Sequence, residues 1–318
     1  MNSRESISPP EGRPGFEYSL KRDESMATLR DILRKIGAVK KTKQITKAMN
    51  MVAAAKLRST QGKMESFEPY AAKFAEVLGN LASRIEPDIH PLLVKKETVS
   101  RVELLHFSAD RGLCGSFNSH TINMAEKWLQ ERDSEGVSCS LTLVGKKGND
   151  YFKKTRYPIT EVHTNIYGKV DISFVNQMSR GFIERYLRDE VDEVYMIYTR
   201  FLSVAKQQPT LVKLIPIEPP EAAEGDSATD AADYLCEPSA EELLIELLPK
   251  HISVQIFNAF LQNETSEHAA RMSAMDNASK NCSELIDSLT LSYNKARQAA
   301  ITAELMDIVG GAEALKSA

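Results

Sequence analysis

One stretch of the sequence, from His251 to Val309, contains neither glycine nor proline. As a single α-helix that rises about 1.5 Å per residue, this stretch would be about 90 Å long. A compact domain made from the whole chain would have a radius of gyration of only about 20 Å, so the helix would extend far beyond it. The sequence therefore predicts a long projecting helix that binds a partner outside this chain.

The composition is that of a soluble globular protein, with 42% hydrophobic and 26% charged residues in a chain of 318. No stretch approaches the roughly 18 consecutive apolar residues of a transmembrane helix, so membrane contact is expected only through another subunit. The cysteines show no CxxC spacing, which argues against a zinc site or a disulfide framework and favours a reducing cytosol. They are Cys114, Cys139, Cys236 and Cys282.

The first 25 residues lack the apolar core of a signal peptide and carry several acidic residues, which also argues against a transit peptide. Two interpretations remain open for residues 1–25. They form a disordered extension, or Met26 is the true start and the upstream residues are a translation-start artefact.

Residues 26–85 are predicted to form a second long helix, because apolar residues recur with alternating steps of three and four. This spacing begins at Leu29, is interrupted by Lys43, Thr46 and Asn50, and resumes at Ala53. A helix with such an interrupted seam is not expected to form a stable coiled coil with a second copy of itself, so its expected partner is the C-terminal helix. Pro69 is expected to kink the N-terminal helix.

The C-terminal coiled-coil helix and its tip are assigned to residues 241–318. Its seam is expected to run through Met272, Met275, Ser279, Cys282, Ile286, Leu289, Tyr293, Ala296, Ala300 and Ala303. The side chains shrink to alanine toward the end, and each buried CH₂ that is lost removes about 0.8 kcal/mol. The tip is therefore expected to need a surrounding sleeve.

Between the two helices, residues 99–220 read as alternating strands and helices, which predicts an α/β domain with a largely parallel, Rossmann-like sheet. The expected strands are Val102 to Phe107, Leu141 to Val144, Val194 to Tyr198 and Leu211 to Ile217. The expected helices are Ser119 to Arg132 and Asp171 to Arg188, with Asp171 as the N-cap of the second. Residues 221–240 read as an acidic loop or linker. The fold class is mixed α+β, a long antiparallel coiled coil with a central α/β domain.

The N-terminal helix is strongly basic, with Asp31 as its only acid between Arg30 and Lys63. An imbalance of this size predicts an acidic counterpart nearby. Nucleic acid is one candidate, but the formal net charge of the chain is -4 and the helix has few aromatic residues for base stacking. An acidic protein surface is therefore favoured.

The segment from Asp110 to Asn118 follows the first predicted strand, where α/β folds often bind phosphates or dinucleotides. Its glycines do not have the dinucleotide spacing, and Gly145 to Gly148 lacks the ending of a phosphate loop. A tight structural turn formed by Asp110, Arg111, Gly112, Gly115 and Asn118 is the favoured interpretation. Cys114 has no histidine at a recognisable spacing to activate it, and the histidines show no metal-ligand pairing. The sequence thus predicts no catalytic residues, no metal and no cofactor, and favours a transmission element over an enzyme.

Several separated segments carry a specific likeness to one family. The segment from Gln44 to Arg58, QITKAMNMVAAAKLR, resembles the N-terminal signature of the F-type ATP synthase gamma subunit. The turn from Asp110 to Asn118 is similar to the central motif of that family. Tyr293 to Thr302 and Ile308 to Ala312 resemble its C-terminal signature, and Ser266 to Met272 also matches.

The resemblance implies a non-catalytic central rotor shaft in a proton-translocating complex. The paired helices would enter a hexamer of alpha and beta subunits, and the α/β domain would contact the epsilon subunit and the ring of c subunits. An asymmetric shaft would impose a different conformation on each of three beta subunits, and its rotation would exchange those conformations. The implied location is peripheral, on the cytoplasmic face of the bacterial inner membrane, with membrane contact only through the complex and no nucleic acid partner.

The resemblance also implies roles for particular residues. Those expected to couple to the beta subunits are Lys47, Met49, Arg297, Gln298, Thr302 and Glu304. Arg297 could pair with a carboxylate through a bidentate contact. Arg271 is expected to stabilise the helix pair. The tip in the apolar sleeve would include Ile308, Val309, Gly310 and Gly311.

Overall fold

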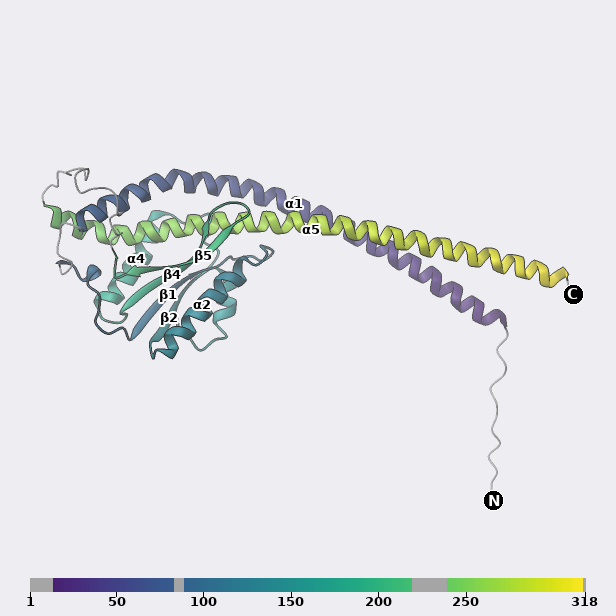
Figure 1. Cartoon of the computed structure of the whole chain (residues 1–318), viewed down its shortest axis with the longest axis horizontal. Coiled ribbons are helices and arrows are strands. Elements are labelled where there is room, and N and C mark those ends of the chain that lie inside the picture. The colour runs from purple at the N-terminus through teal and green to yellow at the C-terminus, as the bar shows by residue number, and fades with distance from the viewer. Residues whose placement is uncertain (1–13, 83–88, 219–238, 317–318) are drawn as a thin grey trace, which may run out of the picture. The chain divides into compact units, whose positions relative to one another are not determined.

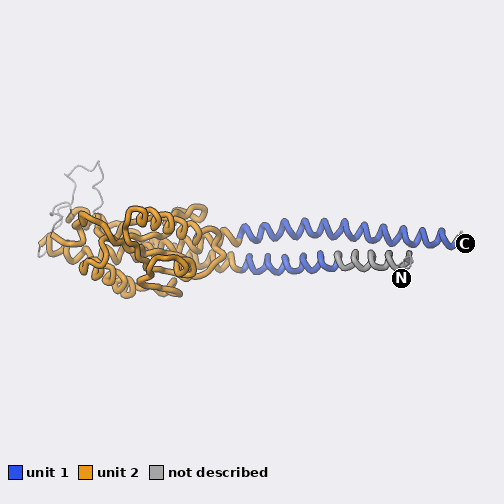
Figure 2. Tube along the Cα trace, turned by 90° about the horizontal axis from the view of Figure 1, so that it is seen from below, with its two compact units in different colours: residues 1–48, 276–318 blue, residues 49–275 orange. Residues whose placement is uncertain are grey.

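The computed structural model describes the backbone of residues 14–82, 89–218 and 239–316 (Figure 1). The chain forms two compact units, one of residues 1–48 with 276–318 and one of residues 49–275 (Figure 2). Two helices belong to both units, α1 (Pro14–Ala82) and α5 (Ala240–Lys316). The two long helices of the predicted fold class are thus present.

The helix seams follow the predicted spacing. On α1, Ile36, Thr46, Ala53 and Leu57 are buried, and the polar interruption at Lys43 and Asn50 is half-buried along the same stripe. On α5 the predicted seam residues are buried or half-buried as far as Ala300, whereas Ala303 is exposed. The antiparallel pairing of the helices is confirmed. The seam residues of α5 become less buried toward its C-terminal end.

Both long helices contain a proline. α5 begins at Ala240, next to the assigned boundary at residue 241, and continues through Pro249. The flanking residues Leu248 and Ile252 are fully buried, so core packing holds the helix on both sides of the missing amide. α1 likewise continues through Pro69.

The two predicted terminal and linker segments are described only in part. Residues 1–13 and 219–238 lie outside the described residues, and α1 begins at Pro14, ahead of Met26. The origin of residues 1–25 and the role of the acidic segment stay predictions.

The second unit is built around a five-stranded sheet in the order β3-β2-β1-β4-β5. Its strands are β1 (Arg101–Phe107), β2 (Ser138–Val144), β3 (Ile159–His163), β4 (Glu193–Phe201) and β5 (Gln207–Ile215). Four strands are parallel, and β5 pairs antiparallel with β4. The largely parallel sheet is confirmed, and β3 is the strand that the sequence prediction missed.

Helices cover both faces of this sheet. They are α2 (Phe117–Ser134), α3 (Lys146–Phe152) and α4 (Ile172–Leu187), with a short 3₁₀ turn, η2 (Pro91–Leu93). The side chain of Asp171 accepts a hydrogen bond from the Phe174 amide at 2.8 Å, which confirms the predicted N-cap of α4.

Two hydrophobic cores result. One lies between the sheet and helices α2 and α3, and Trp128 is part of it. The other joins the opposite face of the sheet to α4, the first half of α5 and the last turns of α1. Phe107 and Phe260 meet edge to face there, with ring centroids 4.8 Å apart. The first half of α5 is therefore a core element of this unit.

A buried ion network ties α4 to the sheet. Glu103 on β1 is fully buried and accepts hydrogen bonds from Arg185 at 2.9 and 3.0 Å and from Thr142 at 2.7 Å. Arg185 also donates to Glu161 on β3 at 2.9 Å. One guanidinium thus bridges a central strand and the edge strand.

His106 on β1 gives the fold a pH dependence. Burial lowers the pKa of His106 to about 4, so the unfolded chain binds this proton at a higher pH than the folded chain does. We expect the free energy of unfolding to fall as the pH is lowered from about 6.5 to 4. The measurement is urea denaturation across this range. His106→Leu should flatten the decline, and the exposed His120→Leu should leave it unchanged; equal pH profiles for the two variants would contradict the assignment.

Candidate functional site

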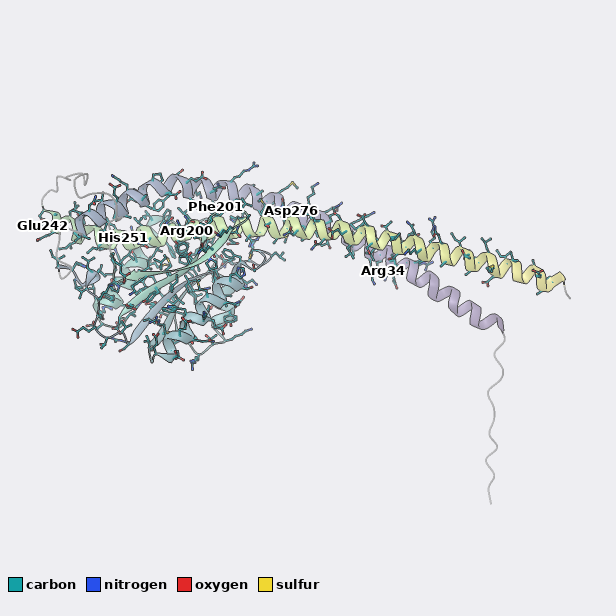
Figure 3. All side chains as sticks on the ribbon, in the orientation of Figure 1. Arg34, Arg200, Phe201, Glu242, His251 and Asp276 are labelled. Atoms are coloured by element: carbon teal, nitrogen blue, oxygen red, sulfur yellow. The ribbon has the colours of Figure 1, made fainter. Side chains whose placement is uncertain are left out.

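The predicted coupling residues near the N-terminus lie on α1. Lys47 is exposed and Met49 is half-buried. In the described part of the first unit, most basic side chains of α1 are also exposed, among them Arg34 (Figure 3). Arg34 forms an exposed ion pair with Asp31 at 3.3 Å. An exposed pair of this kind contributes little to stability, so the basic surface of α1 is available to a partner. Its exposed members are Arg30, Arg34, Lys35, Lys40, Lys41 and Lys47.

The predicted coupling residues near the C-terminus lie on α5. Arg297 and Gln298 are exposed, and among the described residues Arg297 has no ion pair. The hydroxyl of Thr302 donates to the backbone carbonyl of Gln298 at 2.9 Å, while Glu304 is half-buried. The Arg297 side chain is therefore free to meet a carboxylate from outside the chain.

The two coupling groups lie at different levels of the helix pair. The Asn50 side chain donates to the carbonyl of Met272 at 2.8 Å, and Lys47 is one turn from Asn50. Arg297 lies about 37 Å beyond Met272 along α5, at about 1.5 Å per residue. The structure does not bring these groups together, and one small partner loop cannot contact both.

The last turns of α5 expose large apolar side chains. The exposed fraction is 70% for Met306, 68% for Ile308 and 82% for Leu315, and Val309 is also exposed. A Cβ atom on Gly310 or Gly311 would meet nothing within 4 Å. So much exposed apolar surface on one helix is typical of a segment that another protein covers.

The predicted turn from Asp110 to Asn118 is closed by its own polar groups. The Asp110 carboxylate accepts from the backbone amides of Lys146 and Asn165, both at 3.0 Å. Asn118 accepts from the Ala109 amide at 2.8 Å and donates to the sulfur of Cys114 at 3.2 Å. Gly115 has a φ of 59°, a conformation that favours glycine. These bonds support the prediction of a structural turn.

Arg271 connects α5 to this turn. Its guanidinium pairs with Glu267 at 2.7 Å and donates to the backbone carbonyls of Arg111 and Gly112, both at 3.3 Å. These contacts are made to the turn, not to α1, and its role in the helix pair stays a prediction. Burial raises the pKa of the Cys114 thiol within the same turn. A raised thiol pKa disfavours the reactive thiolate.

Asn118 offers a direct test of the turn. Asn118→Ala should lower the free energy of unfolding by about 1–2 kcal/mol, because the buried Ala109 amide loses its acceptor. Urea denaturation followed by the fluorescence of Trp128 measures this change. The exposed neighbour His120→Ala is the matched control and should change it by less than about 0.5 kcal/mol. Equal stability of the two variants would show that the turn does not depend on Asn118.

The segment from Gly145 to Gly148 packs directly on the end of β1 and on Ser108 after it. A Cβ atom at Gly145 would clash with the backbone oxygen of Ser108, and one at Gly148 would lie 2.8 Å from Nδ1 of His106 and 2.9 Å from the Ser108 hydroxyl. The Gly148 amide donates to that hydroxyl at 2.8 Å. Gly145 thus permits close packing on the backbone of Ser108, and Gly148 permits close packing on the side chains of His106 and Ser108, in line with the turn prediction.

Sequence reasoning missed a set of polar residues that fix α5 to the sheet. The Tyr167 hydroxyl donates to the Ser108 carbonyl at 2.7 Å and accepts from Asn263 at 2.9 Å. Asn263 also accepts from the Thr199 amide at 3.2 Å. Isolated polar residues so far apart in sequence form no recognisable motif, so no local pattern could have revealed them.

Among the residues that the structure describes, no group of three or more histidine, cysteine or acidic side chains is placed to hold a metal ion. No helix in the described ranges is long and apolar enough to cross a membrane.

Comparison with known proteins gives a consistent result. Residues 28–315 match a family model described as ATP synthase. The "ATP synthase gamma chain" of Syntrophobacter fumaroxidans is 53% identical over 292 residues, which cover 92% of this chain and 100% of the relative. The protein of the same name from Syntrophus aciditrophicus is 49% identical over 290 residues, which cover 91% and 99%.

Solved structures share the fold. A chain from the Euglena gracilis mitochondrial ATP synthase, in an assembly described as OSCP/F1/c-ring, aligns with a TM-score of 0.63 at 22% identity, covering 92% of this chain and 95% of that one. A rotor chain from the same organism aligns with a TM-score of 0.62 at 23% identity, covering 86% and 99%.

Proposed function

Because the chain belongs to the ATP synthase gamma chain family, we propose that the paired ends of its helices α1 and α5 turn inside a catalytic hexamer. The chain is the central rotor stalk of an F-type ATP synthase and a non-catalytic subunit of that complex. The hexamer consists of alpha and beta subunits, and proton flow drives the rotation.

The observation that carries this proposal is the exposed apolar end of α5. Met306, Ile308, Val309 and Leu315 would be costly to leave in water, since each exposed CH₂ forgoes about 0.8 kcal/mol of burial. A ring of subunits that encloses this end removes the cost. The partner is therefore a sleeve with an apolar lining at the level of residues 305–315.

Charge defines the partner surface nearer to the second unit. The exposed basic side chains of α1 around Lys47 complement an acidic lever on each beta subunit. Further along, Arg297 and Gln298 reach a second loop of beta, with Thr302 and Glu304 beside them. Met49 packs at the edge of the first contact.

The second unit contacts the rest of the rotor. Its partners are the epsilon subunit and the c-ring, and the chain reaches the membrane only through them. This arrangement places the protein peripherally on the cytoplasmic face of the bacterial inner membrane. The proposed function needs no catalytic residues and no cofactor on this chain. The shaft acts by selecting a different conformation in each beta subunit.

Reconstitution tests the proposal. The full chain is mixed with the alpha and beta subunits of the same organism, and the complex is isolated by size exclusion. We expect one copy of this chain per hexamer, and ATPase cooperativity that differs from that of alpha and beta alone. A truncation after Ala300 should weaken retention, because it removes the exposed apolar end. Failure to co-purify, or a truncated chain retained as well as the full one, would overturn the proposal.

A further inference from the structure

The connection between the antiparallel strands β4 and β5 forms an exposed hairpin tip, residues 202–206. Two large apolar side chains lie on it, Leu202 with an exposed fraction of 44% and Val204 with 40%. Ala205 is exposed as well. Single exposed apolar residues are common on protein surfaces, but here they share one short loop.

Hydrogen bonds within the loop close this tip. The Lys206 amide donates to the Ser203 carbonyl at 3.1 Å, and the Ser203 amide donates to the Lys206 carbonyl at 3.0 Å. The side-chain amide of Gln207 donates to the carbonyls of Ser203 at 3.0 Å and Val204 at 2.7 Å. The tip is therefore preorganised, and a partner that binds it does not have to order it first.

The base of the hairpin is attached to α5 (Figure 3). The Phe201 amide donates to the side chain of Gln262 at 2.9 Å. The Ser266 hydroxyl donates to the Thr199 carbonyl at 3.1 Å. Because this part of α5 belongs to the core of the second unit, the hairpin has a fixed position on the α/β domain.

These contacts fix the level of the hairpin along the helix pair. Ser266 precedes Met272 by about 9 Å on α5, at about 1.5 Å per residue. Asn50 on α1 donates to the Met272 carbonyl, and Lys47 is one turn from Asn50. The hairpin base is therefore only about 14 Å along the helices from the level of Lys47, where the proposed contact with a beta subunit begins.

The charge of the hairpin matches that of α1 around Lys47. Residues 200–217 include no aspartate or glutamate. Arg200 and Lys206 are exposed, and among the described residues neither forms an ion pair. On α5 beside the hairpin base, the side chains of Glu264 and Glu267 are only 16% and 7% exposed. The hairpin thus presents a basic surface with an apolar tip, which complements an acidic partner.

We propose that the hairpin tip binds the acidic beta-subunit surface that the proposed function assigns to Lys47, and this inference rests on that function. Leu202 and Val204 pack on apolar side chains of the beta subunit, and Arg200 and Lys206 face its carboxylates. Interfaces commonly combine an apolar centre with a polar rim in this way. The α/β domain then takes a direct part in the coupling contact, together with the helix pair.

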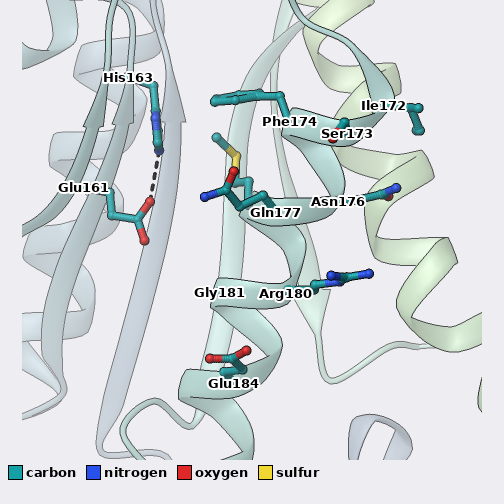
Figure 4. A pocket seen from close by; sticks show the side chains of 11 residues that line it. Glu161, His163, Ile172, Ser173, Phe174, Asn176, Gln177, Arg180, Gly181 and Glu184 are labelled. Atoms are coloured by element: carbon teal, nitrogen blue, oxygen red, sulfur yellow. Dashed lines mark hydrogen bonds and ion pairs between the residues drawn. The ribbon is translucent and has the colours of Figure 1, made fainter.

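The opposite edge of the sheet provides the comparison. A cavity of about 740 Å³ lies there between β3 and α4 (Figure 4). Its acidic side chains are already paired, Glu161 with Arg185 at 2.9 Å and Glu184 with Arg188 at 3.6 Å. Gln177 on α4 lines the cavity and is exposed. The proposal assigns no beta-subunit contact to this edge, so Gln177 is the matched control position.

Photo-crosslinking in the reconstituted complex tests the contact. The full chain carries p-benzoylphenylalanine in place of Val204, or in place of Gln177 as the control, and is assembled with the alpha and beta subunits of the same organism. We expect an adduct with beta from position 204 and little or none from position 177. If no complex forms, the proposed function fails. If the complex forms but position 204 gives no adduct with beta, or no more than position 177, this inference alone is overturned.

Charge reversal tests the acidic character of the partner surface. In the chain with the photoreactive residue at position 204, Lys206→Glu should lower the yield of the beta adduct about threefold, because like charges then meet. Lys154→Glu is the control, since Lys154 is exposed and follows α3 on the way to the start of β3. It should leave the yield unchanged. Equal yields from the two variants, in complexes assembled to the same extent, would overturn the proposal.

Discussion

Arg185→Met should lower the free energy of unfolding by about 3–5 kcal/mol, the largest loss of stability expected from a single substitution in the described residues. The substitution keeps the aliphatic stem but leaves the fully buried Glu103 without its cation. Burial raises the pKa of the Glu103 carboxyl, and Arg185 opposes that rise. Urea denaturation followed by the fluorescence of Trp128, the only tryptophan, provides the measurement.

The pH dependence of this loss has a definite sign. A carboxyl whose folded-state pKa lies above its unfolded value is destabilising when it is charged, and protonation relieves the cost as the pH falls through the folded-state pKa. The gap between the wild type and Arg185→Met should therefore be larger at pH 8 than at pH 5. A gap that does not change with pH would show that the loss comes from packing and not from charge.

Two controls accompany the substitution. Arg188 lies just under one helical turn after Arg185. It is exposed, and its guanidinium pairs with the carboxylate of Glu184 at 3.6 Å. Arg188→Met should cost less than about 0.5 kcal/mol. The double variant Glu103→Gln with Arg185→Met should recover part of the lost stability, because it removes the unpaired charge. If the double variant is less stable than Arg185→Met, the account of a stranded charge is wrong.

Arg297→Ala should slow ATP synthesis by about tenfold in the assembled complex, the change expected when a rate-limiting step loses about 1.4 kcal/mol of stabilisation. The side chain is exposed and outside the apolar seam, so its removal leaves the helix pair intact. The contact that would be lost is the proposed charge-assisted one to a beta subunit. Synthesis and proton pumping are measured in membrane vesicles, beside the amount of assembled complex.

Lys295→Ala is the matched control for this variant. Lys295 is also basic and exposed, but it stands about 200° around the helix from Arg297. It should therefore leave synthesis close to the wild-type rate. If Arg297→Ala assembles, pumps and synthesises like Lys295→Ala, the coupling role of Arg297 is wrong. Reduced assembly in Arg297→Ala alone would instead assign a structural role to the residue.

The elements that could be predicted are those with a repeated local signal. The steps of three and four along α1 gave the correct buried stripe through Ile36, Thr46 and Leu57, because periodicity reports directly which face of a helix is covered. Asp171 could be recognised as a cap because its position before an apolar run is itself the signal.

The elements that were missed lack such a signal. β3 is five residues long, half-exposed and interrupted by a register shift beside Leu141, so neither a long apolar run nor a clean alternation marks it. The start of α5, in contrast, was assigned one residue from where it lies, and burial of Leu248 and Ile252 against residues distant in sequence holds the helix through Pro249. Tertiary packing there outweighs the local preference of proline.

Only the residues that this chain contributes to the candidate site could be predicted. The positions of Lys47 and Arg297 follow from family likeness, and the structure adds that they are exposed and stand at different levels. In the proposed function their partners are carboxylates on other subunits, which leave no pattern in the sequence of this chain. The contacts of Arg271 could not be predicted from the sequence either, because the carbonyls that accept its hydrogen bonds belong to a turn distant in sequence.

The unbroken course of α5 has a mechanical consequence. Its first half is fixed by fully buried side chains, among them Leu244, Leu248, Ile252 and Ile256, and its second half has no comparable core. A twisting load on the free half is therefore carried to the fixed half by one continuous ladder of backbone hydrogen bonds, with no loop that could unwind in between. The torsional stiffness of the shaft would then be set by the thinly covered turns of α5 after Met275.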